Sequence, residues 1–444
     1  MIPVNIKNKL MKRIVLIAAC LLLTEVLPAQ NPVLPPGVYI ADPAGRVGPD
    51  GKLYIYGSLD ESTEYYCSDR YHLLSSADLH SWQLQENIFT AASKNDGAQY
   101  ANGPLYAPDM CYRNGRYYLY YCLPDGTEGV VTSKRPEGPF RNGLKITGPA
   151  QIDPAVFIDD DGQAYYYWGQ FEAKGARMNP DMKTIDTTSI VEGLVTEKKH
   201  FFHEGAFVFK RKGIYYMVYS HIGRQDRPTC IGYATAHSPL GPFKYGGVII
   251  DNAGCDPAVW NNHGSVVAFH GKWYVLYHRA THNSATMRKA CIEPITFRPD
   301  GSIPEVFMTS QGAGAPLTAT KKIDAERACL LFGNVRIQLM QGTSQNEALM
   351  AIRNGDRAAW KFINYGNGVR HCNIRVRARA GGRIDIIDNY PWHGPRGSIT
   401  VPADGSWSTI SCEVTGLAGI QALWLQFHGQ PGKDLFDIDW IKFE

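Results

Sequence analysis

One pattern recurs five times in the first two thirds of the chain, and it constrains the fold more than any other feature of the sequence. Each copy has an ionisable residue beside a proline, a glycine or a small residue, then a turn glycine, then an aromatic-rich segment. The copies begin at Ala41, Ala107, Ile152, His203 and Asn262. Repeats of this length with two recognisable strands each are typical of four-stranded propeller blades. The pattern therefore predicts a five-bladed β-propeller.

The ionisable residue of each copy is expected at the start of the innermost strand of its blade. These five residues are Asp42, Asp109, Asp153, Glu204 and His263, and the turn glycines that follow them are Gly51, Gly115, Gly162, Gly213 and Gly271. Innermost strands of a propeller surround one axis, so their first residues converge at one end of it. A charge is costly to bury at the start of an apolar strand unless it is paired or used. The sequence thus predicts one shared site.

The character of the sequence changes after the last copy. Residues 308–322 are rich in Gly, Ala and Thr and are interpreted as a linker. Beyond them, segments such as NVRIQLM, CNIRVRARA and GRIDIID alternate apolar with polar residues, as half-buried strands of a sandwich do. The predicted organisation is all-β, with a propeller over 31–307 and a β-sandwich over 323–444.

The N-terminus has the features of an export signal. In MKRIVLIAACLLLTEVLPAQ, two basic residues follow Met11, an apolar run covers 14–23, and Ala29 offers a cleavage site. We therefore interpret 1–30 as a signal peptide, with Met11 where translation would begin, and expect a secreted or periplasmic protein. Lipid anchoring at Cys20 is the lesser alternative, because the apolar run continues past it. No other segment is long and apolar enough to span a membrane.

Composition and short motifs exclude several classes of function. Lys plus Arg number 45 and Asp plus Glu 42, and a net charge of +3 gives no electrostatic footprint for nucleic acid. Of the 10 cysteines, those after Cys20 are odd in number and form no CxxC pair, which argues against a zinc site or a complete disulfide framework. The sequence also has no GxSxG, no Walker loop and no HExxH, so hydrolysis through a serine or a zinc ion has no support.

Three of the repeated ionisable residues form a set suited to cleaving a glycosidic bond. That reaction needs two carboxylates, one as acid and the other as base or nucleophile, and a third nearby raises the pKa of the acid by repulsion. Asp42, Asp153 and Glu204 supply three carboxylates. Glu204 is the predicted acid, since its side chain reaches further and glutamate has the higher ordinary pKa. Alternatively, the three residues cap strand starts or bind a structural ion. Asp109 is predicted to be a structural cap.

Four motifs in order, ADPAGRV, YAPDM, IDPAVFIDDDGQAYYYWG and HEGAFVF, resemble glycoside hydrolase family 43 over about residues 36–307. The resemblance implies a five-bladed propeller and hydrolysis with inversion, without a cofactor for catalysis. It also implies roles for the trio, with Asp42 as general base, Asp153 as the residue that adjusts the pKa of the acid, and Glu204 as general acid.

The same resemblance nominates four further residues. MRKACIEPITF is similar to the arginine-bearing strand of the family, so Arg288 is a candidate to contact the sugar and hold Asp153, the alternative being a surface charge. NNHGSVV is similar to the stretch whose histidine lies on the axis and often ligates an ion or water. His263 is thus a candidate substrate or metal ligand, the alternative being a hydrogen-bonded core histidine. Tyr106 stands where the family often has Trp, and His203 is a candidate wall residue of the pocket.

The C-terminal region resembles a family 6 carbohydrate-binding module. IDAERA, NGDRAAWKFINYGNGV, GGRIDI, DGSW and FDIDWIKFE follow the order of that module over 323–444, which implies a jelly-roll sandwich. Trp392, in the loop NYPWHGPRG, is a candidate sugar platform or else a lid over the core. Glu326 is a candidate ligand of a structural calcium ion, and Trp360 is expected in the core.

Together these inferences predict a secreted, inverting glycosidase that acts on the side chains of plant polysaccharides. The predicted activity is exo-acting removal of α-L-arabinofuranose, with β-xylosidase activity close behind. An exo-β-galactanase or an endo-arabinanase of the same fold is an alternative, and a non-catalytic glycan-binding protein is an alternative from another class. The expected partner is a plant cell-wall polysaccharide or oligosaccharide.

Overall fold

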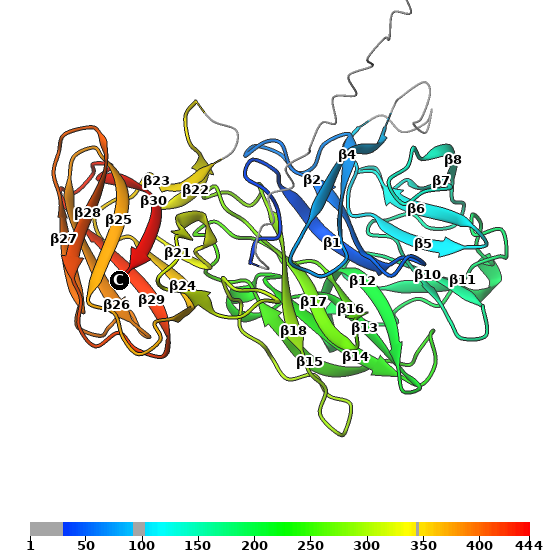
Figure 1. Cartoon of the computed structure of the whole chain (residues 1–444). Coiled ribbons are helices and arrows are strands. Elements are labelled where there is room, and N and C mark those ends of the chain that lie inside the picture. The colour runs from blue at the N-terminus through cyan, green and yellow to red at the C-terminus, as the bar shows by residue number, and fades with distance from the viewer. Residues whose placement is uncertain (1–29, 92–102, 343–345) are drawn as a thin grey trace, which may run out of the picture.

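The computed structural model describes residues 30–91, 103–342 and 346–444, and nearly all of its regular structure is β-strand (Figure 1). The helical elements in these ranges are short: α1 (Glu197–His200), η1 (Thr187–Ser189), η2 (Arg224–Asp226) and η3 (Ala325–Arg327). None of the described helices has the length and hydropathy needed to cross a membrane. Except for Gln30, the predicted export signal lies outside the described residues.

The first eighteen strands form five antiparallel sheets in chain order. The first sheet holds β1 (Ile40–Val47), β2 (Leu53–Leu59), β3 (Arg70–Ser76) and β4 (Gln83–Thr90), and the second holds β5 (Asp109–Arg113), β6 (Arg116–Cys122), β7 (Glu128–Ser133) and β8 (Arg141–Lys145). The third holds β9 (Ala155–Ile158), β10 (Ala164–Trp168) and β11 (Lys174–Arg177). The fourth holds β12 (Phe202–Arg211), β13 (Ile214–His221), β14 (Cys230–Ala236) and β15 (Lys244–Asp251), and the fifth holds β16 (Ser265–Phe269), β17 (Lys272–Arg279) and β18 (Lys289–Ile295).

The first strands of the five sheets contact one another in a ring. β1 contacts β5, β5 contacts β9, β9 contacts β12, β12 contacts β16, and β16 returns to β1. This places the starts of the five repeats around one axis, as the sequence predicts. The expectation of four strands in every sheet is wrong, because the third and fifth sheets each have three strands among the described residues.

The turn glycine of each repeat lies in the tight turn between the first and second strands of its sheet. All five glycines have φ between +75° and +83°, a region that residues with a Cβ avoid. The turn glycine therefore marks the point at which each first strand ends.

The aromatic residues of the repeats fill the space between adjacent sheets. The second strand of every sheet carries at least one tyrosine with no exposed surface, including Tyr56, Tyr120, Tyr166, Tyr216 and Tyr277. The hydroxyl of each donates a hydrogen bond to a carbonyl or a carboxylate, so burial leaves no polar atom of these side chains unpaired. The high aromatic content is in large part structural.

The C-terminal region consists of two sheets around one large apolar core, with a smaller apolar cluster that includes Ala359 and Trp424. One sheet contains β19 (Leu317–Thr318), β24 (Arg357–Asn364), β29 (Ile420–His428), β26 (Gly382–Asp388) and β27 (Gly397–Val401), with β21 (Leu330–Phe332) beside β24. The other contains β22 (Arg336–Leu339), β23 (Glu347–Met350), β30 (Phe436–Phe443), β25 (His371–Ala378) and β28 (Trp407–Glu413), with β20 (Ile323–Asp324) beside β30. Trp360 has no exposed surface and packs in this core, as expected.

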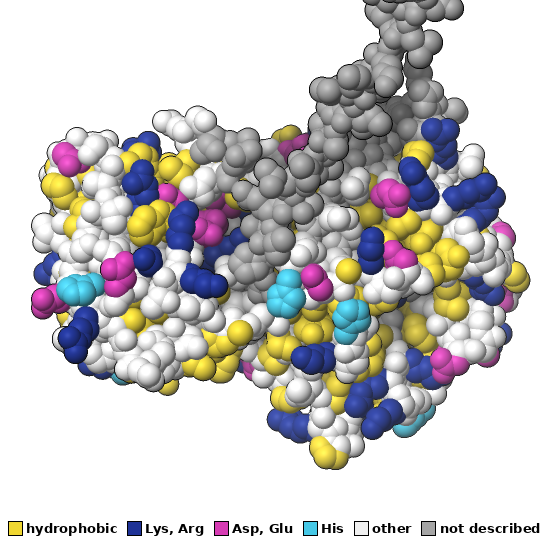
Figure 2. Space-filling model, viewed as in Figure 1, with side chains coloured by type: hydrophobic (Ala, Val, Ile, Leu, Met, Phe, Trp, Pro, Cys, Tyr) yellow, Lys and Arg dark blue, Asp and Glu magenta, His cyan; other side chains and the backbone are white. Residues whose placement is uncertain are grey.

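The two regions are joined by buried contacts. Lys289, at the start of β18, forms a 2.5 Å ion pair with Glu347 of β23, and both side chains are almost completely buried. The stretch 308–322, predicted as a linker, is packed between the regions: the backbone N–H of Thr309 donates to Glu293 and that of Ser310 to the carbonyl of Lys361. On the face shown in Figure 2, basic and acidic side chains are interspersed.

Candidate active site

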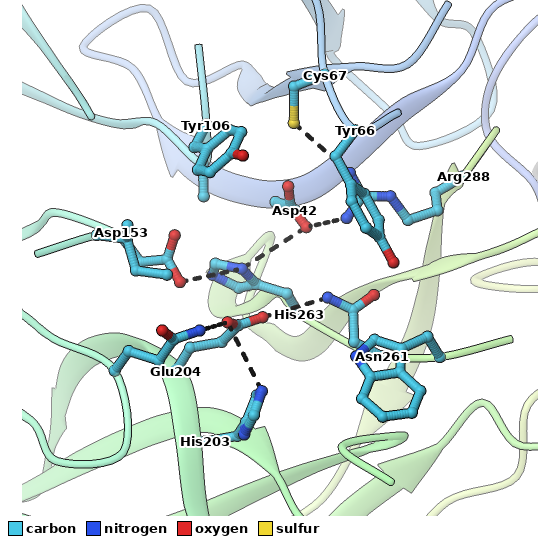
Figure 3. Close-up of a pocket in the computed structure, with 14 residues that line it drawn as sticks. Asp42, Tyr66, Cys67, Tyr106, Asp153, His203, Glu204, Asn261, His263 and Arg288 are labelled. Atoms are coloured by element: carbon cyan, nitrogen blue, oxygen red, sulfur yellow. Dashed lines mark hydrogen bonds and ion pairs between the residues drawn. The ribbon is translucent and has the colours of Figure 1, made fainter. Parts of the chain in front are cut away.

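A cavity of about 230 Å³ lies where the first strands of the five sheets converge (Figure 3). The residues that line it are Asp42, Tyr66, Cys67, Tyr106, Ala107, Ile152, Asp153, Gln170, His203, Glu204, Trp260, Asn261, His263 and Arg288. The structure thus brings together seven of the residues nominated from the sequence and leaves Trp392 and Glu326 elsewhere, in the C-terminal region.

Irregular backbone at the strand starts turns the carboxylates toward the cavity. Asp42 and Asp153 each precede a proline and have positive φ, +52° and +62°, which aspartate tolerates better than most residues. The pairing of β1 with β2 shifts register between Ala41 and Ala44, and that of β12 with β13 shifts after Glu204. Such bulges re-aim side chains and are common beside active sites.

Gly205, the residue after Glu204, is required by the packing of His263. It has φ +70°, and a Cβ at this position would lie 2.6 Å from His263 Nε2. The HEG sequence therefore lets the imidazole ring lie directly against the backbone that carries Glu204.

Asp42 is buried and held in its charged form. Its Oδ1 accepts a hydrogen bond from Arg288 Nη1 at 2.9 Å, and its Oδ2 accepts one from Ser58 Oγ at 2.7 Å. Burial alone would raise the pKa of Asp42, but the positive charge of Arg288, together with the nearby His278 and His263, outweighs it and holds that pKa well below the ordinary value. A carboxylate in this setting stays ionised, which is the form that a general base needs.

Arg288 has different partners from those expected. Its Nε and Nη2 donate to Asp60 at 2.8 and 3.0 Å, its Nη1 donates to Asp42, and the guanidinium lies over the Tyr66 ring at 4.8 Å. The prediction that Arg288 holds Asp153 is therefore wrong, as is the alternative of a surface charge. The planar, forked guanidinium suits two carboxylates at once, and both are on the first sheet or the loop that follows β2.

Asp153 lies in the opposite electrostatic environment. Burial and the nearby charges of Glu204 and Asp42 raise its pKa well above the ordinary value. No described residue makes a hydrogen bond to its buried Oδ2. His263 Nδ1 lies between the two aspartates, 3.6 Å from Asp42 Oδ1 and 3.9 Å from Asp153 Oδ2, and burial lowers the pKa of this imidazole.

Glu204 is held by two side-chain amides. Gln170 Nε2 donates to Oε2 at 3.0 Å, and Asn261 Nδ2 donates to Oε1 at 3.2 Å. His203 Nε2 lies 3.9 Å from Oε2, which agrees with a wall position for this histidine. The sequence reasoning missed Gln170 and Asn261. For Asn261 a signal was available, since it lies two residues before His263 in NNHGSVV.

Aromatic side chains form much of the remaining wall. Tyr106 lines the cavity, as expected, and Tyr66 lies against Arg288. Trp260 lines the cavity with 46% of its surface exposed, so one part of the ring meets solvent. Neither Tyr66 nor Trp260 was predicted from the sequence.

Asp109 does not line this cavity, and its contacts are those of a structural residue. Its carboxylate accepts hydrogen bonds from Arg46 Nε at 2.9 Å and from the backbone N–H of Val156 at 2.7 Å. It therefore ties together β1, β5 and β9, the first strands of three sheets, in agreement with the predicted role as a cap.

The described residues contain no group of three or more His, Cys, Asp or Glu side chains arranged to hold a metal ion. His263 faces two aspartates at ion-pair rather than coordination distances. Glu326 is buried, with a pKa raised to about 8 by that burial, and an ionised carboxylate is what a calcium ion would need. The described residues thus do not form a metal site.

The cavity presents two carboxylate positions with different environments. Asp42 is kept charged by Arg288, whereas Glu204 accepts hydrogen bonds from neutral amides and lies near the carboxyl group of Asp153. Two carboxyl groups that face one cavity and have different partners are the arrangement that paired acid and base catalysis uses.

Comparison with known families agrees with this chemistry. A model of the glycosyl hydrolases family 43 matches residues 29–303, and a model of the carbohydrate binding module (family 6) matches residues 331–444. The chain belongs to glycoside hydrolase family 43. It is a glycosidase with a C-terminal module of family 6.

Relatives match along most of the chain. A "Xylosidase/arabinosidase" of Thermoclostridium stercorarium is 30% identical, over 91% of this chain and 97% of the relative. An "Arabinoxylan arabinofuranohydrolase" of Bacillus subtilis (strain 168) is 29% identical, over 89% of this chain and 88% of the relative. The crystal structure of a family 43 arabinoxylan arabinofuranohydrolase from Bacillus subtilis in complex with cellotetraose has a TM-score of 0.54 at 26% identity, over 94% of this chain and 99% of that one.

The raised pKa of Asp153 predicts a pH-dependent stability. An aspartate in the unfolded chain loses its proton near its ordinary pKa of about 3.9, whereas folded Asp153 keeps its proton to higher pH. The folded state then binds more protons, so stability falls as pH rises above about 4, by about 1.4 kcal/mol per pH unit until Asp153 ionises in the folded state.

Asp153→Asn removes this titration and preserves the shape of the side chain. We expect the variant to unfold at a higher temperature than the wild type at pH 7 and at nearly the same temperature at pH 4, measured by calorimetry across that range. Parallel pH dependences of the two proteins would contradict the assigned environment of Asp153.

Proposed function

We propose that this protein is an inverting, exo-acting glycosidase that removes terminal α-L-arabinofuranose from arabinoxylan-type plant polysaccharides, with β-xylosidase activity at the same site. The observation that carries the proposal is the single cavity in which Asp42 is paired with Arg288 and Glu204 with two amides. The cavity, at about 230 Å³, is below the roughly 300–1,000 Å³ typical of sites for drug-sized ligands, which favours one sugar unit. The names of the relatives favour arabinose and xylose.

The proposed reaction uses the two carboxyl groups once each. Water gives a proton to Asp42 as its oxygen attacks the anomeric carbon, and Glu204 gives its proton to the glycosidic oxygen, which departs with the rest of the polysaccharide as an alcohol. The charge of Arg288 keeps Asp42 ready to accept that proton. Asp153 takes part through its effect on the protonation of its neighbours.

We also propose that the five sheets are the blades of a five-bladed β-propeller over 31–307, joined by 308–322 to a jelly-roll β-sandwich over 323–444. The ring of contacts among the first strands and the two packed C-terminal sheets support this division. The apolar run before Ala29 supports export from the cell, and a mature chain that starts at Gln30 would mark that cleavage.

Substitution of either carboxyl group tests the reaction. Glu204→Gln and Asp42→Asn are each expected to lower kcat by about 10²–10⁴-fold, because each removes one proton transfer. The assay is release of p-nitrophenol from the α-L-arabinofuranoside, the β-D-xylopyranoside and the β-D-galactopyranoside, together with sugar release from arabinoxylan and arabinan.

The matched control is Asp160→Asn, which changes a carboxylate that is 86% exposed and outside the cavity, and it should keep wild-type activity. Near-full activity of Glu204→Gln or Asp42→Asn would contradict the catalytic role proposed for that residue. Dominant galactoside release, or activity on arabinan alone, would replace the proposed substrate, and no release from any substrate would favour a glycan-binding protein.

We further propose that Trp392 is a sugar platform of the C-terminal region. It is 75% exposed and lies stacked on Tyr390, with ring centroids 4.9 Å apart at 15°. Asp388 and Arg396, at the two ends of the loop that holds these two rings, form an ion pair at 2.7 Å that fixes the loop. An exposed flat ring on a fixed loop suits contact with a sugar face, and the exposure argues against the lid alternative.

Trp392→Ala is expected to reduce the amount of protein retained on insoluble arabinoxylan about tenfold, while hydrolysis of a soluble aryl glycoside is unchanged. A pull-down at a series of polysaccharide concentrations measures this. Phe307→Ala, which removes a ring that is 71% exposed and outside this loop, is the control. Equal retention of the wild type and both variants would show that Trp392 is not part of a binding surface.

A further inference from the structure

The general acid and the general base are connected by hydrogen bonds through two residues that the proposed reaction does not use. These residues are His278 of β17, which has no exposed surface, and Asn261, in the segment before β16. The backbone N–H of Asp42 donates to His278 Nδ1 at 3.2 Å, and Asn261 Nδ2 donates to Glu204 Oε1 at 3.2 Å.

The bond from Asp42 fixes the proton position on the His278 ring. Since Nδ1 accepts a hydrogen bond, the ring proton lies on Nε2. Asp42 Oδ1 is 3.4 Å from Nδ1, but the backbone N–H of Asp42 is nearer and can only donate, so Nδ1 carries no proton. Nε2 points at Asn261, with the backbone carbonyl at 3.1 Å and the side-chain Oδ1 at 3.2 Å.

The proton on Nε2 in turn fixes the orientation of the Asn261 amide. An N–H faces an oxygen and not another N–H, so Oδ1 of Asn261 turns toward His278 and Nδ2 turns toward Glu204. The backbone of Asn261 is held independently, because Asn252 Nδ2 donates to the carbonyls of Asn261 and His278 at 2.9 and 2.8 Å. The direction in which Asn261 Nδ2 donates to Glu204 is therefore set, through His278, by the backbone N–H of Asp42.

We propose that Asn261, oriented by His278, is a positioning residue that holds the carboxyl group of Glu204 in place for proton transfer to the leaving group. The Asn261 amide donates to Oε1 of Glu204, and Gln170 donates to Oε2. The Asn261 N–H also stabilises the carboxylate that forms when Glu204 gives up its proton. The His278 imidazole also accepts a hydrogen bond from the backbone of Asp42. This series of hydrogen bonds therefore also fixes the distance between the acid and the base. This inference rests on the proposed role of Glu204 as general acid.

Asn261→Ala removes the donor and tests the proposal through two readouts that a merely structural residue would not move. Without the N–H, the carboxylate of Glu204 loses a hydrogen bond that stabilises its charged form. The basic limb of the pH profile of kcat/KM should then shift upward by about one unit. The second readout is a series of aryl glycosides with leaving groups of increasing basicity. The loss of rate should be about tenfold for the poorest leaving group and near zero for a dinitrophenyl glycoside, which needs no acid.

Asn261→Asp is the second variant, in case the alanine protein does not fold. It keeps the size of the side chain and an oxygen for His278, and its added negative charge should move the basic limb further upward. The matched control is Asn179→Ala. The Asn179 amide lies outside the cavity and donates to Thr184 Oγ1 and not to Glu204, so the basic limb and the leaving-group series should keep wild-type behaviour.

Glu204→Gln, assayed on the same leaving-group series, separates failure of this inference from failure of the proposed function. If Glu204→Gln slows poor leaving groups selectively but both Asn261 variants leave the basic limb and the series unchanged, Glu204 is the acid and Asn261 does not position it. If Glu204→Gln shows no dependence on the leaving group, the assignment of the acid itself is overturned. A basic limb that shifts equally in Asn179→Ala would also contradict the specific role of Asn261.

Discussion

The site depends on one buried cation that is shared between two carboxylates. Arg288 is the only Arg or Lys among the residues that line the cavity, and its guanidinium binds both Asp42 and Asp60 at 3.0 Å or less. A buried carboxylate without such a partner becomes neutral, as the raised pKa of Asp153 illustrates. The placement of Arg288 therefore decides which carboxyl group of the trio keeps its charge and which resists ionisation.

The fold brings these groups together from distant parts of the chain. Asp42, on β1, and Arg288, just before β18, are 246 positions apart in the chain. They meet because the fifth sheet lies beside the first, where β16 contacts β1 and closes the ring. The C-terminal region supports the same corner of the molecule. Lys289, next to Arg288, is bound by Glu347 across the interface, so the strand that carries the cation is held from both sides. A module that resembles a binding domain thus also contributes to the structure around the active site.

Local sequence features predicted the fold, but they could not predict which side chains of distant strands contact one another. Turn glycines such as Gly115, and the buried tyrosines, follow from short-range rules on φ and strand composition, and these features are present in the structure. The convergence of Asp42, Asp153 and Glu204 followed from the repeat. The partner of Arg288 was predicted wrongly because it depends on register between β18 and the loop after β2. Gln170 and Asn261 were missed because an amide in a loop carries no signal until its neighbours are known.

The stereochemistry of the product tests the central claim, that Asp42 and Glu204 act on opposite sides of the sugar with water between them. Proton NMR of the reaction mixture, recorded during the first turnovers before the free sugar equilibrates, distinguishes the two anomers. The account predicts that the first product released from the α-L-arabinofuranoside is the β-anomer, because water attacks directly on the face opposite the leaving group. Initial formation of the α-anomer would require a covalent intermediate and would contradict the assignment of Asp42 as a base.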